Sequence, residues 1–591
     1  MRKVVLILAV VLWGAGPTRA EEVSLEEIQS AIAAGVERIL ACQRDDGCFV
    51  VSEHHVKEYP VGSTGLALLA LEYARPHLKG ELSGRALDAI HKGFAFITQS
   101  APEQRTYSAG LIISALYKEN PERYNKLIGL YAAMLIISQH DKGDISGEWG
   151  YKLHLPPGFP GSNKVTAENW GDKSNTQFAL LGLYQADRVG FQVPKIVWAR
   201  SRDHYLRAQF LDGGWGYKPE LRPEPYANMT IASTISLNLC EEMLFAERHK
   251  QCKPQPRSKP IENGLKWIDE NWEKQRIGSD TYGLYALERL GIIMGRGSIG
   301  RHDWYNEGAR KLLPSRTWSS FAGTPDVSAC FGVMFLARGL EPIIINKLER
   351  RDTTDWNNDP YDVKHLVEFI YDHYQLPVQW RIVTLEAPLE LLLRTPILYI
   401  SGHYKLEFSE DEKKKLKDYV LGGGTIFGQA CCAKPEFDKS FRELVKELFG
   451  GELRPIPKTH RIYERMRIRS LAPTPEVDAF LFDKEQGRPG VIYLPHDQCC
   501  RWHAGGAEAR ESFAVGTGIY FYITIEGRKM FQRSHPETAP KTPEVPEPEL
   551  VPEPPAPKDE PQPVTPNPEP KPEEKAPPGP AVPRDTSETR P

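Results

Sequence analysis

Two pairs of adjacent cysteines are the residues of this chain with the clearest capacity for chemistry. Cys431 and Cys432 follow a predicted strand and directly precede a predicted helix. A thiol at such a strand-to-helix turn lies close to a helix N-terminus and to backbone N–H groups, which lower its pKa and can hold an oxyanion. His496 and Asp497 follow a later predicted strand, where they could serve as a base and its orienting carboxylate. One hypothesis is therefore a thiol-dependent amide or acyl hydrolase.

The same thiols support two other interpretations. In an oxidising compartment, one cysteine of the first pair could be bridged to Cys499 or Cys500, which would staple the sheet. The spacing His-x-x-Cys-Cys-x-x-His, together with His403 and Cys431, could instead form a metal site; its members are His496, Cys499, Cys500 and His503. Adjacent cysteines rarely serve one tetrahedral ion. We therefore place the disulfide first, unpaired structural thiols second and the metal third, and we predict no cofactor.

The elements that must position these residues alternate between strand and helix after Ile345. Ser409 and Glu412 form a capping box at the start of a charged helix, and a further helix is expected at 436–448. The predicted strands are 381–385, 396–402, 425–432, 491–494 and 519–523. Alternating strands and helices imply an α/β domain with a doubly wound, mostly parallel sheet that is covered on both faces.

The first 340 residues repeat a different unit, a helix pair whose second helix is rich in small and apolar residues. The second helices begin near Ser63, Ser108, Asn175, Met229, Asp280 and Asp326. A recurrence of this kind is typical of a repeat architecture. Several connecting loops carry Gln before a glycine and aromatic cluster, as at Gln43, Gln139 and Gln209. Six inner helices ringed by six outer ones predict an all-α α/α toroid.

These Gln-to-Gly-Trp loops followed by apolar helices resemble the repeats of the prenyltransferase and squalene-cyclase superfamily over residues 23–345. The resemblance implies the toroid fold but not the chemistry. The chain has no Asp-x-Asp-Asp acid of the cyclases and no Cys-Gly-Glu-Gln thioester, and Asp326 and Cys330 do not have the spacing of the prenyltransferase zinc ligands.

The long loops of the toroid hold aromatic and acidic residues of the kind that bind sugar faces or peptides. The members of this set are Glu148, Trp149, Tyr151, Trp170, Asp172, Asp212, Trp215, Tyr217 and Asn228. A toroid enzyme or binder for an isoprenoid or polysaccharide would use such residues. We favour the alternative, in which the tryptophans are structural pins between repeats.

The second domain also carries a resemblance. Ser401, Gly402 and His403, the strand that ends in Cys431 and Cys432, and the segment 491–497 resemble an exported bacterial domain of unknown function numbered four-one-five-nine, over residues 358–532. This family has no established activity, and its fold is similar to that of class I glutamine amidotransferases. The Gly-x-Cys-x-Gly elbow and the His-x-Glu motif of those enzymes are not intact here, so the resemblance implies a degenerate, non-catalytic site.

The two ends of the chain differ in composition from the parts that are predicted to fold. Arg2 and Lys3, an apolar run and a small residue at Ala20 predict a signal peptide at 1–20, with an uncleaved anchor as the alternative. No other stretch approaches membrane-spanning length. A linker is expected at 346–357, and the Pro-, Glu- and Lys-rich tail 536–591 should be disordered. The chain is therefore expected to be exported, periplasmic or extracellular, with no stable membrane span after signal removal.

The composition of the chain argues against one class of partner, nucleic acid. A net charge of -4 provides no basic field for nucleic acid. Nine cysteines are an odd number, so at least one is free or bonded to another chain; Cys42 and Cys48 could form a bridge. We predict an exported binding or assembly protein that is not an enzyme and whose partner is an envelope protein, a small molecule or a glycan.

Overall fold

The computed structural model describes most of the chain between its two ends. The described residues are 23–50, 59–160, 162, 168–218, 224–245, 258–314, 318, 325–351, 353–466, 475–482, 487–506 and 509–534. The predicted signal peptide 1–20 and the predicted tail 536–591 lie outside them. By their contacts these residues belong to one unit of the chain, Met1–Glu547. No helix in the described ranges is long and apolar enough to cross a membrane.

Six pairs of helices make up the described part of residues 25–339. The inner helices are buried on nearly all sides, because small and apolar residues occupy every face. They are α3 (Pro60–Ala74), α5 (Thr106–Glu119), α7 (Lys173–Arg188), α9 (Ala227–Phe245), α11 (Thr281–Ile293) and α13 (Pro325–Gly339). The outer helices bury one face each and are α1 (Leu25–Leu40), α4 (Gly80–Gln99), α6 (Asn125–Ser138), α8 (Lys195–Ala208), α10 (Lys259–Glu270) and α12 (Trp304–Leu312).

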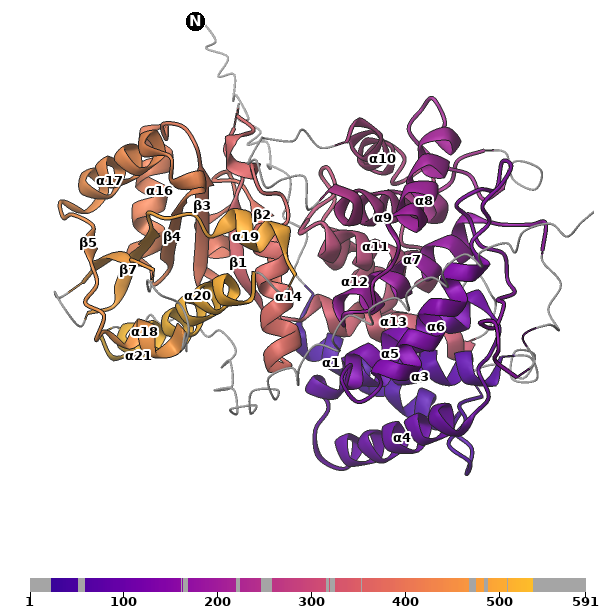
Figure 1. The fold of residues 1–591 in the computed structure, drawn as a ribbon. Helices are drawn as coiled ribbons and strands as arrows, with labels where there is room; N and C mark the ends of the chain where they lie inside the picture. Colours follow the sequence, from indigo (N-terminus) through magenta and orange to yellow (C-terminus); the bar gives the residue numbers. More distant parts are fainter. Residues whose placement is uncertain are drawn as a thin grey trace, which may run out of the picture. The chain divides into compact units, whose positions relative to one another are not determined.

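The inner helices form a closed ring. Each packs against the next, and α13 packs against α3 (Figure 1). Close approach depends on glycine: a Cβ atom on Gly110 of α5 would lie 2.4 Å from the carbonyl oxygen of Phe178 in α7. The ring confirms the predicted α/α toroid.

The Gln residues of the loops tie successive outer helices together. The side-chain amide of Gln139 donates to the carbonyl oxygen of Val197 in α8 at 2.9 Å. Gln43 makes the same contact with Ala89 in α4 at 2.8 Å, and Gln209 makes it with Pro260 in α10 at 2.8 Å. The motif therefore satisfies backbone groups within the fold.

Seven strands form one sheet in the order β2-β1-β3-β4-β7-β6-β5. The first five in this order are parallel, and β6 pairs antiparallel with both β7 and β5. The strands are β1 (Ile343–Leu348), β2 (Gln379–Val383), β3 (Ile397–Gly402), β4 (Thr425–Ala430), β5 (Arg454–Pro455), β6 (Asp478–Leu481) and β7 (Pro489–Leu494). This arrangement confirms the predicted α/β domain with a mostly parallel sheet.

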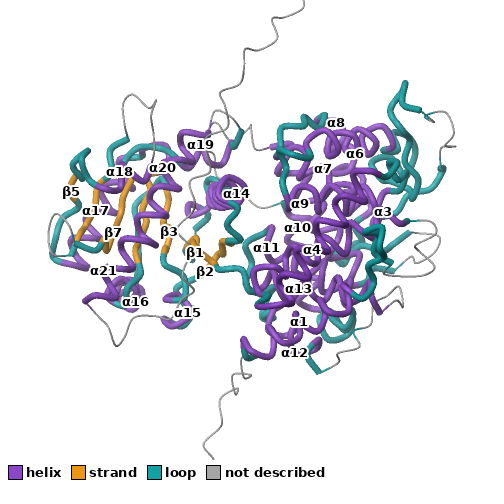
Figure 2. Tube along the Cα trace, turned by 90° about the horizontal axis from the view of Figure 1, so that it is seen from below, coloured by secondary structure: helices purple, strands orange, loops and turns teal. Residues whose placement is uncertain are grey.

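Helices cover both faces of the sheet, and each face has its own apolar core (Figure 2). One face is covered by α14 (Asp362–Tyr374), α18 (Arg461–Met466), α19 (Cys499–Ala504) and α20 (Arg510–Phe521). The other is covered by α15 (Leu389–Leu393), α16 (Glu410–Leu421) and α17 (Pro435–Phe449). A π-helical turn, Tyr522–Gly527, and α21 (Arg528–Ser534) follow α20.

Two predictions about this domain are wrong. The run 519–523 is the end of α20 and the start of the π-helical turn, because a short apolar run fits a buried helix as well as a strand. The predicted linker 346–357 begins inside β1, so the sheet starts before residue 358. Buried Asn346 and Lys347 interrupt the apolar pattern of β1, and Lys347 is stabilised there by the carboxylate of Asp362 at 2.6 Å.

Candidate functional site

A cluster of thiols, carboxylates and a histidine lies at the carboxyl edge of the parallel strands. Gly402 of β3 is paired in register with Ala430 of β4, so His403 and Cys431 leave the sheet next to each other. The loop after β1 contributes Asp359, and α19 after β7 contributes Cys499. The chain leads from β1 to β2 on one side and then crosses to β3 on the other. Such switch points form ligand-binding crevices in open α/β sheets.

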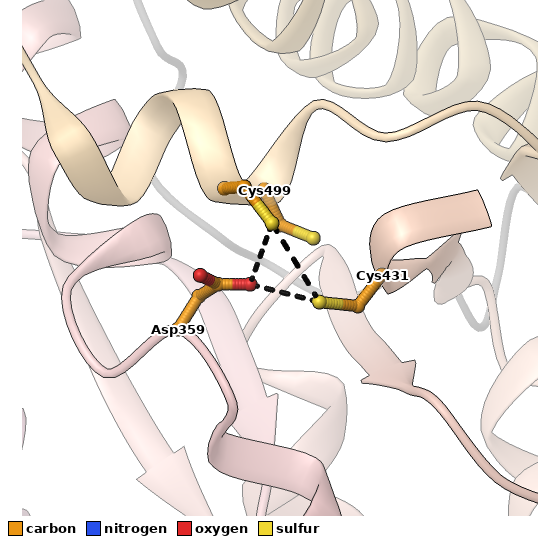
Figure 3. A group of neighbouring side chains, drawn as sticks. Asp359, Cys431 and Cys499 are labelled. Carbon is orange, nitrogen blue, oxygen red and sulfur yellow. Dashed lines mark hydrogen bonds between the residues drawn. The ribbon is translucent and has the colours of Figure 1, made fainter. Parts of the chain in front are cut away.

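Three fully buried side chains form the centre of the cluster. Asp359 is 2% exposed, and Cys431 and Cys499 are 0% exposed. The Cys431 thiol donates to Oδ2 of Asp359 at 3.0 Å, and Figure 3 shows all three side chains converging on one point. With Cys500 they form a group whose ligand atoms all lie within 4.8 Å of one another.

The second cysteine of each pair has a distinct state. Cys432 is partly exposed and has a left-handed backbone (φ 53°), as does Ala433 (φ 51°). Left-handed non-glycine residues are strained and cluster at functional sites. Cys500 is disulfide-bonded, and its Sγ lies 3.9 Å from that of Cys431 and 3.8 Å from that of Cys432.

His403 approaches the thiols from β3. Its ring, Cys431 and Cys432 form a second group whose ligand atoms lie within 4.8 Å of one another. The side chain is 4% exposed, and its Nε2 has no hydrogen-bond partner among the described residues. Asp355 accepts the backbone N–H of His403 at 2.9 Å. Burial lowers the pKa of His403, so the ring is neutral and can act as an acceptor or ligand.

Burial governs the charge state of the central groups. It raises the pKa of Asp359 to about 7, with a further rise from the nearby Asp362. The thiols of Cys432 and Cys499, together with burial, raise the pKa of Cys431 far above the ordinary value. Burial also raises the pKa of Cys499. The two thiols therefore hold their protons at neutral pH unless a cation replaces them, whereas Asp359 is about half protonated there.

Of the predicted base and metal ligands, some lie at the thiol cluster and others contact residues elsewhere. His496 is largely exposed and faces Glu476 at 3.5 Å, away from the cluster. Asp497 does join it: one oxygen accepts the thiol of Cys499 at 3.3 Å and the backbone N–H of Cys500 at 3.2 Å. Nδ1 of His503 accepts the backbone N–H of Tyr361 at 3.1 Å. The predicted His-x-x-Cys-Cys-x-x-His set therefore does not converge, because its histidines point to other partners.

The described residues do not form the predicted disulfides. The sulfurs of Cys431 and Cys432 lie 3.9 and 3.8 Å from that of Cys500, beyond a bond length of about 2.05 Å, and Cys499 is a free thiol. Cys42 and Cys48 are also free. Their thiols point apart, since Cys42 donates to Arg38 in α1 whereas Cys48 lies 3.8 Å from Thr64 in α3.

Sequence reasoning missed Asp359 and Asp355. Both lie in the loop after β1, which the sequence analysis assigned to a linker and to the first residues of the domain. The signal was available in the run of Asp and Asn at 355–359, which directly follows a strand of a parallel sheet. Because strand β1 was assigned to a linker, this run was not recognised as part of a loop at the end of a strand.

The predicted ligand residues of the toroid fall into two groups in the structure. Some are buried and hold neighbouring helices together, and others are accessible aromatic residues. The indoles of Trp149 and Trp215 are 0% exposed and donate to carbonyl oxygens of Leu135 at 2.7 Å and Tyr205 at 2.9 Å. The acids are also engaged inside the fold.

Glu148 lies 2.8 Å from His204, and Asp212 accepts the indole N–H of Trp267 at 2.9 Å. Asn228 donates to Asp280 at 3.3 Å. Of the predicted ligand residues, Tyr151, Trp170 and Tyr217 form an accessible aromatic group, with Tyr151 stacked on Trp170 at 4.9 Å.

Asp172 should make the stability of the toroid depend on pH. It caps α7 by accepting the Asn175 backbone N–H at 2.8 Å, and burial raises its pKa to about 6. Its folded pKa exceeds the unfolded value, so the carboxylate destabilises the fold above pH 6, and this cost is lost as pH falls from about 6 to about 4. Asp172→Asn, which keeps the cap, is expected to stabilise the protein at pH 7.5 by up to about 3 kcal/mol.

The measurement is thermal unfolding of both proteins between pH 4 and 8. The difference between them should disappear at the acid end. A difference that is constant across this range would contradict the assignment.

Comparison with known proteins gives a family match within the second domain. Residues 345–516 match a family model described as Domain of unknown function (DUF4159). The match covers the loop after β1, the elbow after β4 and the first part of α20, and therefore includes every residue of the cluster. No curated protein matches the chain.

Proposed function

We propose that this chain is an exported binding protein whose α/β domain binds a thiophilic divalent metal ion through Asp359, Cys431 and Cys499. One observation carries the proposal: a carboxylate and two thiols, all at most 2% exposed, converge within 4.8 Å. Thiolates and carboxylates are the ligands of zinc-class ions. Export rests on the signal-like residues 1–20.

The dimensions of the group suit such an ion. Zinc–sulfur bonds of about 2.3 Å place two thiolates of a tetrahedral site about 3.8 Å apart. The groups, already within 4.8 Å, need to approach by roughly 1 Å or less. Cys500 belongs to the same group, but its sulfur is engaged in a disulfide bond. Three protein ligands therefore leave a fourth position for water or a further ligand.

A bound dication would also offset the burial of three acidic groups in one place. Lys347 donates to the backbone carbonyl of Asp359 at 2.7 Å and to the carboxylate of Asp362 at 2.6 Å. The positive charge of Lys347 is thus paired with the carboxylate of Asp362. The alternative is a hydrogen-bonded cluster in which the thiols stay protonated and act as small apolar groups.

Zinc titration of the full chain against a chromophoric chelator tests the proposal. We expect one zinc ion per chain, and we expect cadmium to give the sulfur-to-metal charge-transfer absorption that reports thiolate ligands. Native mass spectrometry of the same sample checks the stoichiometry. Failure of both ions to bind would leave the hydrogen-bonded cluster as the correct description.

The turn after β4, which contains Cys431–Ala433, favours a second candidate function. This candidate is a thiol-dependent acyl or amide hydrolase that uses Cys432. This residue has the strained backbone, it is partly exposed, and neutral His403 lies in its group with Asp355 behind it. Here His403 takes the role that the sequence analysis gave to His496.

If Cys432 is a nucleophile, iodoacetamide should label it before buried Cys431 and Cys499, and Cys432→Ser should abolish hydrolysis of activated thioesters. His403→Gln should do the same without changing the fold. Equal hydrolysis by wild type and both variants would contradict this candidate.

A further inference from the structure

A second cleft, of about 1010 Å³, lies at the opposite edge of the sheet, where the parallel strands begin. Its walls include Pro342 before β1, Pro396 before β3 and Gly424 before β4, and the toroid contributes Gly297 and Asp303. Five of its lining residues are arginines: Arg296, Arg381, Arg394, Arg488 and Arg528. This cleft shares no residue with the thiol cluster.

Fewer acidic than basic residues line the cleft. Asp303, Glu341 and Glu349 line it. Asp303 caps α12 by accepting the backbone N–H of Asn306 at 3.0 Å. Glu341 accepts the side-chain amide of Gln379 at 3.0 Å and lies 3.9 Å from Arg338, which is not part of the lining. Three carboxylates therefore face five guanidinium groups, and two of the three are engaged in the fold.

Arg381 and Arg488 are the most informative members. Within the described ranges, neither forms a salt bridge, although Asp303 lies near enough to Arg381 to offset part of the lowering of its pKa. Arg488 donates to the backbone carbonyls of Val420 at 2.7 Å and Gly424 at 3.0 Å, and its guanidinium lies 4.6 Å from the ring centre of Phe482. Arg381 lies directly against Gly297, where a Cβ atom would be 2.7 Å from its Nε.

Burial lowers the pKa of Arg488 to about 10 and also lowers that of Arg381. A guanidinium withdrawn from water without a carboxylate is costly. A bound anion offsets that cost, and the planar fork of arginine suits phosphate and carboxylate groups.

The spacing of the arginines indicates more than one anionic group. Arg394 precedes β3 and Arg488 precedes β7, which lie two strand positions apart in the sheet. Arg381 is on β2, two positions to the other side of β3. With strands about 4.8 Å apart, the backbones of neighbouring arginines are separated by roughly 10 Å. The volume of the cleft admits a ligand larger than a single phosphate, with anionic groups at more than one of these positions.

We infer that this cleft binds a small ligand with at least two separated oxyanion groups, phosphate or carboxylate, held by Arg381, Arg394 and Arg488. The site is independent of the proposed metal site, since the two lie at opposite edges of the sheet and share no residue.

Calorimetric titration of the full chain at constant ionic strength tests this inference, with tripolyphosphate, citrate and inorganic phosphate as probes. We expect tripolyphosphate or citrate to bind more tightly than phosphate; the tighter of the two identifies the chemical class. Arg381→Gln and Arg394→Gln should each weaken that binding by about 10-fold or more, because each removes a charge-assisted contact.

Arg85→Gln is the matched control, because Arg85 is exposed and paired with Glu37 at 2.8 Å. It should leave binding unchanged. Arg488→Lys keeps a charge in the core and should reduce affinity less than Arg488→Gln. No binding of any probe, or an equal loss in Arg85→Gln and Arg381→Gln, would overturn the inference.

Discussion

Replacing Cys431 by serine is expected to abolish stoichiometric zinc binding while the protein stays folded. Cys431 is the central ligand, because its sulfur belongs both to the group of Asp359 and Cys499 and to the group of His403 and Cys432. A serine hydroxyl is not deprotonated at neutral pH and is a poor ligand for a thiophilic ion. Loss of groups that only support a ligand costs about 10- to 100-fold in affinity, so loss of the ligand itself should exceed about 100-fold.

Two variants make this measurement specific. Cys42→Ser removes a thiol in the toroid that is outside the cluster, and it should retain one zinc ion per chain. Cys432→Ser should also retain zinc, because Cys432 is not one of the three proposed ligands. Circular dichroism and thermal unfolding of each apo protein establish that the fold persists. Stoichiometric zinc in Cys431→Ser would contradict the proposed ligand set.

The fold was predictable where the sequence pattern has one interpretation. The inner helices of the toroid repeat small and apolar residues, and the capping box of Ser409 and Glu412 marks the first turn of α16. The pattern failed where buried polar residues have partners that are distant in sequence. Lys347 lies inside β1 only because Asp362 neutralises it, and no local pattern encodes that contact.

The candidate site was predictable only in part, for a related reason. The position of Cys431 and Cys432 follows from strand and helix order, so the elbow was found. The partners of these thiols depend on which strands are neighbours, and the sheet order places β3 and β7 beside β4, with β1 next to β3. Asp359 and His403 thereby replace His496 at the thiols. Strand order in a parallel sheet is set by crossover connections, which a single sequence does not reveal.

The contact between the toroid and the α/β domain leads to the second large prediction. Lys364 of α14 donates to Glu242 of α9 at 2.5 Å and to the Tyr184 hydroxyl of α7 at 2.5 Å. The side chains of Lys364 and Glu242 are 2% and 1% exposed. Burial alone would raise the pKa of Glu242, but Lys364 and His365 hold it at about 2. The carboxylate therefore stabilises the fold above its unfolded pKa, and this stabilisation is lost as pH falls from about 4.5 to about 2.

Lys364→Met is expected to destabilise the protein by about 3 to 5 kcal/mol at neutral pH, because it leaves Glu242 charged and buried without its cation. Adding Glu242→Gln should recover much of that loss, since no buried charge then remains. Lys414→Met removes an exposed pair with Asp418 and should cost less than about 0.5 kcal/mol.

Calorimetric unfolding of the wild type and the three variants checks these values. Because Lys364 and Glu242 join the two domains, loss of this ion pair should also split the unfolding of the toroid from that of the sheet. A single, unshifted transition in Lys364→Met would show that this contact contributes no coupling.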